Sequence, residues 1–168
     1  SHKSRKARRN YVAYLLALNT GMRAGEIWGL KPRDISLSAD GEGDTIFVRR
    51  QFHGIERKFT LLKGARKTGK DKSRHVPCAP ILRNELRALI EHNQTGSDEP
   101  IFQTPFGNPI HHDCFADLFA RDLKKWGGRR IRFHDLRHTA ATLMLAKGVD
   151  VKTVSEILGH EDLSTTMV

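Results

Sequence analysis

The sequence predicts an α+β fold: a mostly α-helical domain with a small antiparallel three-stranded sheet. Two observations carry this prediction. Apolar residues recur at helical spacing in several segments, and one stretch in the first half alternates apolar and polar residues as a strand does. Glycines and prolines separate these segments. At 168 residues the chain is long enough to bury one core without disulfides or metals.

Helical spacing and capping residues predict six helices. Asn10 is a suitable N-cap for the first helix, which ends at Thr20. Pro32 follows a short second helix, and Pro80 begins a later one. Asp150 is a suitable cap for the last one. The expected helical ranges are about 10–19, 24–30, 80–92, 113–126, 135–147 and 151–158.

Three strands are expected in the first half of the chain. Thr45–Phe52 follows a glycine-rich turn and alternates as a strand. Phe59–Leu62 and His75–Cys78 are the second and third strands, and the lysine-rich segment Lys63–Arg74 is the tip of the hairpin between them. Residues 1–9 are basic and without periodicity, so we expect a linker there and a folded domain over residues 10–168.

The charge of the chain indicates a polyanionic partner. Its net charge is +10 and its pI is about 10.0. The basic residues form three clusters, which suit a surface that follows a phosphate backbone. The middle cluster supplies the expected DNA-binding residues Lys63, Arg66, Lys70, Lys72 and Arg74. The two cysteines imply no disulfide framework, and no apolar run is long enough to span a membrane.

The chemistry is expected to centre on two arginines and two histidines. His134 and Arg137 lie three residues apart at a predicted helix start, and His160 follows a leucine-glycine break. Arg23 also stands at a helix start, where its guanidinium can reach a phosphate beside free backbone N–H groups. Alone, Arg23 also fits a surface arginine or an intrahelical pair with Glu26. Together the four residues predict a phosphate site.

A metal site is the alternative for the histidines. His134 and His138 have the i, i+4 spacing of zinc-binding helices. However, Asp135 stands where a catalytic glutamate would follow the first histidine, and Arg137 would lie beside the ion. We therefore expect no metal and no other cofactor.

These motifs, in this order, resemble the catalytic domain of the tyrosine recombinases, the phage-type integrases. The matching pieces are Thr20-Gly-Met-Arg-Ala-Gly-Glu-Ile27, Lys67-Thr-Gly69 with Arg74-His-Val-Pro77, His134-Asp-Leu-Arg-His-Thr-Ala-Ala-Thr142, and Leu158-Gly-His160. A type IB topoisomerase shares the chemistry, but the last two motifs fit phage-type integrases better.

The resemblance implies a metal-independent cleavage of DNA. Arg23 and Arg137 would bind the scissile phosphate, and His160 would donate a hydrogen bond to it. His134 would transfer a proton near the nucleophile. Lys67 would protonate the leaving 5′ oxygen, with Lys70 and Lys72 as alternatives on the same hairpin. We interpret Glu26 and Asp135 as supporting residues that orient the arginines, and His138 as a core or supporting residue.

In this family a tyrosine attacks the phosphate and forms a 3′-phosphotyrosyl link. Counting about nine residues from His160, as the family's spacing implies, gives position 169, just beyond Val168. Tyr11 and Tyr14 precede Arg23, so neither is assigned as the nucleophile. We expect a fragment that ends just before its tyrosine and binds DNA without cleaving it. The alternative is a nucleophile-free DNA-binding module that occupies sites or blocks an active recombinase.

The expected partners follow from the same resemblance. They are double-stranded DNA, a missing N-terminal DNA-binding domain joined through residues 1–9, and other recombinase protomers in a tetrameric synapse. A cytoplasmic, nucleoid-associated protein of prokaryotic or phage origin is expected, with no membrane contact.

Overall fold

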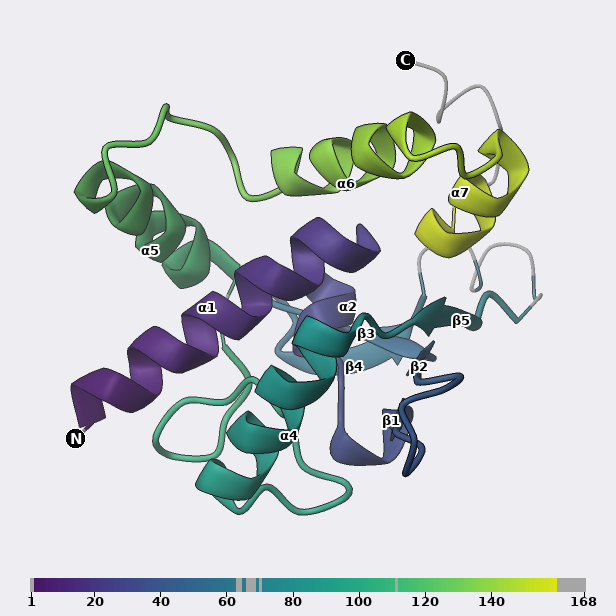
Figure 1. The fold of residues 1–168 in the computed structure, drawn as a ribbon. Helices are drawn as coiled ribbons and strands as arrows, with labels where there is room; N and C mark the ends of the chain where they lie inside the picture. The colour runs from purple at the N-terminus through teal and green to yellow at the C-terminus, as the bar shows by residue number, and fades with distance from the viewer. Residues whose placement is uncertain (1, 63–64, 66–68, 70, 111, 160–168) are drawn as a thin grey trace.

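The computed structural model describes residues 2–62, 65, 69, 71–110 and 112–159, and it confirms a mostly helical α+β fold (Figure 1). The α-helices within these residues are α1 (His2–Thr20), α2 (Ala24–Trp28), α4 (Pro80–Asn93), α5 (His112–Lys125), α6 (Asp135–Ala146) and α7 (Val151–Leu158). A 3₁₀ turn, η1 (Pro32–Asp34), follows α2. The predicted cap of α7 is present, because the Asp150 carboxylate accepts a hydrogen bond from the backbone N–H of Thr153 at 3.0 Å.

The first helix begins earlier than expected. Asn10 is not its N-cap, and residues 2–9 are helical rather than an irregular linker. No glycine or proline interrupts this stretch. The fold also anchors it. Arg9 is buried and donates to the Gln103 carbonyl at 3.1 Å, and Arg8 pairs with Glu85 at 3.2 Å.

The strands form two antiparallel sheets. β1 (Ile35–Ser36), β2 (Thr45–Val48) and β5 (Arg74–Pro77) form a three-stranded sheet in the order β1-β2-β5, with Ile46 opposite Val76. β3 (Arg50–His53) and β4 (Lys58–Leu61) pair as a separate hairpin, with Phe52 opposite Phe59.

The expected strand 45–52 is therefore divided in two, and the second and third expected strands do not pair with each other. The division falls at Arg49. Asp34, which is buried, attracts both Arg49, at 3.5 Å, and Arg50, at 2.5 Å. These ion pairs hold the chain where it leaves one sheet for the other. The third strand of the larger sheet is β1, which the sequence pattern did not indicate.

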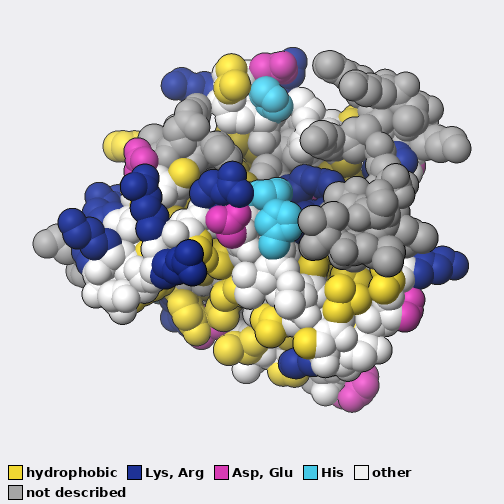
Figure 2. All heavy atoms as spheres, turned by 90° about the horizontal axis from the view of Figure 1, so that it is seen from above, with side chains coloured by type: hydrophobic (Ala, Val, Ile, Leu, Met, Phe, Trp, Pro, Cys, Tyr) yellow, Lys and Arg dark blue, Asp and Glu magenta, His cyan; other side chains and the backbone are white. Residues whose placement is uncertain are grey.

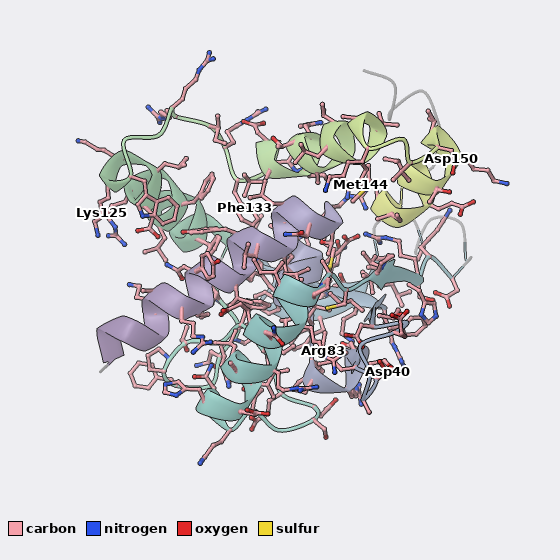
Figure 3. All side chains as sticks on the ribbon, viewed as in Figure 1. Asp40, Arg83, Lys125, Phe133, Met144 and Asp150 are labelled. Atoms are coloured by element: carbon pink, nitrogen blue, oxygen red, sulfur yellow. The ribbon has the colours of Figure 1, made fainter. Side chains whose placement is uncertain are left out.

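The core surrounds α1 and is rich in aromatic residues. The Trp28 and Phe115 rings lie 4.4 Å apart between centroids. Phe133 lies in the segment that joins α5 to α6 (Figure 3). Its ring packs edge-on against Phe115. Trp28 is 1% exposed, as expected of a packing residue. Trp126 differs, because it is 62% exposed although its ring touches Tyr14.

The packing of α1 brings several element ends together. Figure 1 shows α6 above the C-terminal end of α1, where the chain turns into α2, and α7 to the right of that end. Gly21 makes this turn with φ +62°, a conformation that favours glycine. The start of α2, the start of α6 and the end of α7 thus meet at one place. No helix in the described part of the chain is long and apolar enough to cross a membrane.

Candidate phosphate-binding site

Arg23 occupies the N-cap position of α2. Its Nη1 lies 3.2 Å from Glu26 Oε1, and its Nη2 donates to the Gly159 carbonyl at 3.3 Å. Its backbone N–H also donates to Glu26 Oε2 at 2.9 Å. The Arg23 side chain is 27% exposed, so it remains accessible to a ligand from solvent.

Arg137 lies in the first turn of α6 and is nearly buried. Its residue is 4% exposed. Nη1 donates to the Gly21 carbonyl at 2.6 Å, and Nη2 donates to the Leu158 carbonyl at 2.8 Å. Burial, and then the nearby Arg23, lower the pKa of Arg137. A bound anion would offset both effects, because its negative charge stabilises the protonated guanidinium.

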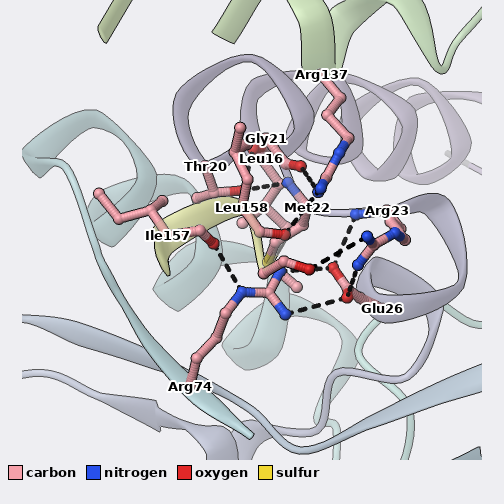
Figure 4. A network of polar contacts seen from close by, with 11 residues as sticks. Leu16, Thr20, Gly21, Met22, Arg23, Glu26, Arg74, Arg137, Ile157 and Leu158 are labelled. Atoms are coloured by element: carbon pink, nitrogen blue, oxygen red, sulfur yellow. Dashed lines mark hydrogen bonds and ion pairs between the residues drawn. The ribbon is translucent and has the colours of Figure 1, made fainter. Parts of the chain in front are cut away.

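The C-terminal end of α7 organises three arginines (Figure 4). The three consecutive carbonyls of Ile157, Leu158 and Gly159 accept from Arg74, Arg137 and Arg23, in that order, at 2.6, 2.8 and 3.3 Å. Carbonyls at a helix C-terminus have no partner within the helix and carry the negative end of its dipole. They therefore attract guanidinium groups, and here they gather three from distant parts of the chain.

Glu26 is the only carboxylate that contacts these arginines in the described residues. It is 1% exposed, and Arg74 binds it with two hydrogen bonds of 3.1 and 2.8 Å. Burial alone would raise the pKa of Glu26, but Arg74 and then Arg23 hold it below its ordinary value. Glu26 is thus ionised at neutral pH. It supports Arg23 directly, as a residue in the expected supporting role would.

His134 and His138 lie together on the exposed surface of α6. Their ring centroids are 5.3 Å apart and the rings are perpendicular. His138 is exposed and is not a core residue. Partial burial, and then the neighbouring His138 and Arg137, lower the pKa of His134, so its imidazole is neutral at neutral pH. Figure 2 shows histidine side chains beside Lys and Arg side chains near the middle of the face seen from above.

Asp135 contacts Arg132 rather than Arg23 or Arg137. Its carboxylate accepts from the Arg132 backbone N–H at 2.8 Å and from the Arg132 Nη2 at 2.9 Å. Its contacts therefore fix the turn that enters α6 and, through it, the helix start that carries His134. Any support that Asp135 gives to Arg137 therefore passes through this helix start and not through a direct contact.

Arg74 is the residue whose position differs most from expectation. We expected it on a DNA-facing hairpin, but its side chain is only 10% exposed and is bound to Glu26. No local pattern signals this role, because its partners lie 48 and 83 residues away. Lys72 is described, whereas Lys63, Arg66, Lys67, Lys70 and His160 lie outside the described residues. The described residues hold no group of three or more side chains suited to bind a metal.

Comparison with known proteins places the chain in a family. The Phage integrase family matches residues 1–168. The chain belongs to the phage integrase family. It is 32% identical, over 96% of its length, to the "Tyrosine recombinase XerC-like" of Caldanaerobacter subterraneus subsp. tengcongensis, of which it covers 45%. It is 30% identical to the "Tyrosine recombinase XerA" of Pyrococcus furiosus, covering 95% of this chain and 49% of that protein.

Solved structures of other integrase-family proteins have the same fold. A crystal structure of XerA recombinase matches 96% of this chain and 51% of that one, with a TM-score of 0.74 and 24% identity. XerH recombinase bound to its difH substrate matches 97% of this chain and 42% of that one, with a TM-score of 0.74 and 26% identity. This member of the integrase family spans about half the length of the curated relatives it matches.

Proposed function

We propose that this chain is the catalytic domain of a site-specific DNA recombinase that cleaves and rejoins strands through a 3′-phosphotyrosine. The observation that carries the proposal is the arginine pair. Arg23 and Arg137 are oriented by adjacent carbonyls at the end of α7 and lie beside the neutral His134. Two fixed guanidinium groups neutralise a phosphodiester and its transition state without a metal ion.

Each step of the reaction is assigned to a residue. Arg23 and Arg137 bind the two non-bridging oxygens of the scissile phosphate. A tyrosine oxygen attacks phosphorus as its proton passes to His134. The bond to the 5′ oxygen then breaks, and Lys67 gives that oxygen a proton. His160 adds a hydrogen bond to the same phosphate. The energy of the broken bond stays in the phosphotyrosyl link, so the reverse reaction rejoins the strand without a cofactor.

The attacking tyrosine is proposed to come from outside these 168 residues. Tyr14 is 6% exposed and donates to Asp122 at 2.8 Å, and burial followed by this bond raises its pKa. A buried phenol with a raised pKa is a poor nucleophile. Tyr11 lies nine residues before Thr20 on α1, roughly 13 Å along the helix axis at its usual rise. Neither tyrosine is suited to attack a phosphate held by the arginines.

The substrate is proposed to be double-stranded DNA, which suits the net charge of +10. The relative XerH was solved in complex with its difH DNA, which supports this choice. A second DNA-binding domain on the N-terminal side of α1 would close around the duplex, and further protomers would complete a tetrameric synapse. Such a protein would act on a chromosome or phage genome in the cytoplasm of a prokaryote.

A nicked suicide DNA substrate tests the proposal. The full-length protein, carrying the tyrosine expected near position 169, should give a covalent protein–DNA band on a denaturing gel. Residues 1–168 alone should bind duplex DNA weakly and give no covalent band. The proposed cleavage activity would be contradicted if a full-length protein with the tyrosine bound its DNA site but formed no covalent link. That result would favour a DNA-binding module that only occupies sites.

A further inference from the structure

Arg74 contacts two parts of the arginine cluster at the same time. Its Nη1 and Nη2 bind the two carboxylate oxygens of Glu26, and its Nε donates to the Ile157 carbonyl at 2.6 Å. It also lies against the backbone of Gly159, where an added Cβ would come within 3.0 Å of Arg74 Nη1. One guanidinium therefore joins β5, α2 and the end of α7 (Figure 4).

The geometry of this contact requires an arginine. A planar guanidinium can bind a carboxylate with two parallel N–H groups and still donate a third bond from Nε. A lysine carries the same charge but cannot reproduce that planar fork. The Arg74 side chain is 10% exposed, so little of it remains available to a DNA backbone. Arg74 thus makes internal contacts between elements of the fold rather than surface contacts with DNA.

The contacts of Arg74 control what the two phosphate ligands can do. By fixing Glu26, Arg74 fixes the carboxylate that holds the Arg23 side chain and backbone. By fixing the end of α7, it fixes the Leu158 and Gly159 carbonyls that orient Arg137 and Arg23. Arg74 therefore acts on both arginines through intermediates that are themselves buried or backbone groups.

We propose that Arg74 is a positioning residue of the phosphate clamp, which we define as Arg23 and Arg137. This inference rests on the proposed function for its effect on cleavage, but its structural part stands alone. Arg74 holds the clamp in a reactive geometry and does not touch DNA. Loss of that geometry lowers the rate of the chemical step, since a displacement of about 1 Å can cost on the order of 10²-fold.

Measurements of cleavage and of DNA binding distinguish a positioning role of Arg74 from a direct contact between Arg74 and DNA. The full-length protein and its Arg74→Lys, Arg74→Gln and Arg23→Gln variants are compared on the same duplex. Arg74→Lys should cleave about 10²-fold more slowly at saturating DNA. Arg74→Gln should keep the wild-type dependence of binding on salt, whereas Arg23→Gln should lose about 0.9 from the log–log slope. Wild-type cleavage by Arg74→Lys, or an equal loss of slope in Arg74→Gln, would overturn the proposal.

A second measurement reads the clamp without any DNA. Hydrogen exchange at the arginine Nε–H groups is followed by NMR in the wild-type protein and in Arg74→Lys. Exchange at Arg23 and Arg137 should quicken in the variant. Exchange at Arg83, which pairs with Asp44 at 2.7 Å elsewhere in the fold, should stay unchanged. Unchanged exchange at Arg23 and Arg137 would reject the positioning role of Arg74, whether or not the protein is a recombinase. Absence of cleavage by the wild-type protein would reject only the proposed function.

A double variant covers the case in which the single variants unfold. Glu26→Gln with Arg74→Met removes both charges of the buried pair, so neither of these two is left unpaired. Arg23 loses its contact with Glu26, but its side chain is 27% exposed to solvent. This variant should regain most of the melting temperature lost by Arg74→Met alone but still cleave slowly, with fast exchange at Arg137. Recovery of full cleavage together with stability would mean that Arg74 is only structural, and the proposal would fail.

Discussion

Arg137 Nη1 donates to the Gly21 carbonyl at 2.6 Å and thereby joins two residues that are 116 positions apart. The bond depends on an unusual backbone, because Gly21 has φ +62°. In this conformation the turn between α1 and α2 presents its carbonyl to a guanidinium on α6. The turn is therefore part of the site, although it carries no side chain of its own there.

Replacing Gly21 by alanine should distort this turn. An added Cβ would lie 2.2 Å from Leu158 Cδ2, and alanine is strained at this φ. We expect a loss of about 2–4 kcal/mol in the free energy of unfolding, from backbone strain and overpacking together. Gly43→Ala is the matched control, because Gly43 has φ +71° with nothing within 4 Å of the added Cβ. The free energy of unfolding of this control, measured in urea, should fall only by the cost of backbone strain, about 1–2 kcal/mol. Equal losses in the two variants would contradict the packing role.

The helices were predictable because their signals are local. Pro80 at the start of α4 and Asp150 before α7 mark boundaries that the structure confirms. The start of α1 was not predictable from its cap, since nothing around Asn10 stops the helix. The strand pairing depended on distant ion pairs with Asp34, and a residue pattern within a single strand carries no information about them.

The site was predictable only in part. Sequence motifs indicated Arg23 and Arg137, and the structure brings both to the same end of α7. Those motifs did not indicate the partners that orient them. The partners are mostly backbone carbonyls, which leave no trace in residue identity. Arg74 was grouped with the surface cations by its basic neighbours, because charge in the sequence does not reveal burial.

Glu26→Gln should destabilise the protein strongly. The substitution leaves Arg74, whose side chain is 10% exposed, without its counter-charge. Breaking a buried ion pair from one side costs about 3–5 kcal/mol. Glu85→Gln is the control, because Glu85 pairs with Arg8 at a more exposed site and should lose less than about 1 kcal/mol. Urea unfolding measures the loss of stability in both variants. Similar losses would show that the buried pair contributes no more to stability than the exposed pair does.

The effect of Glu26 should depend on pH with a defined sign. Its pKa in the folded protein is lowered, so its ionised form stabilises the fold above the unfolded pKa. This stabilisation is lost as the pH falls through the lowered pKa. The difference in unfolding free energy between the wild-type protein and Glu26→Gln should therefore be full at pH 7 and shrink below pH 4.5, the ordinary value. A difference that stays constant with pH would contradict the ionised carboxylate.

His134 should titrate below the ordinary histidine value of 6.5. Partial burial, then the adjacent His138 and Arg137, favour its neutral form, while Asp135 acts in the opposite direction. His138→Gln should therefore raise the pKa of His134, and Asp135→Asn should lower it further. NMR of the imidazole Hε1 resonance measures each midpoint. A midpoint above 6.5 in the wild-type protein would contradict the lowered pKa of His134.

Arg137→Ala should remove half of the clamp. In a full-length protein with the proposed tyrosine, we expect single-turnover cleavage to fall by about 10²–10³, the usual cost of losing one fixed transition-state donor. The log–log salt slope of DNA binding should also fall by about 0.9, because one phosphate contact is lost.

Arg137→Lys should keep that slope but still cleave slowly, since an ammonium group cannot bind the Gly21 and Leu158 carbonyls and a phosphate with the same fixed geometry. Lys152→Gln, on the exposed side of α7, is the control for a change of charge alone and should cleave at the wild-type rate. Wild-type cleavage by Arg137→Ala would remove this arginine from the mechanism.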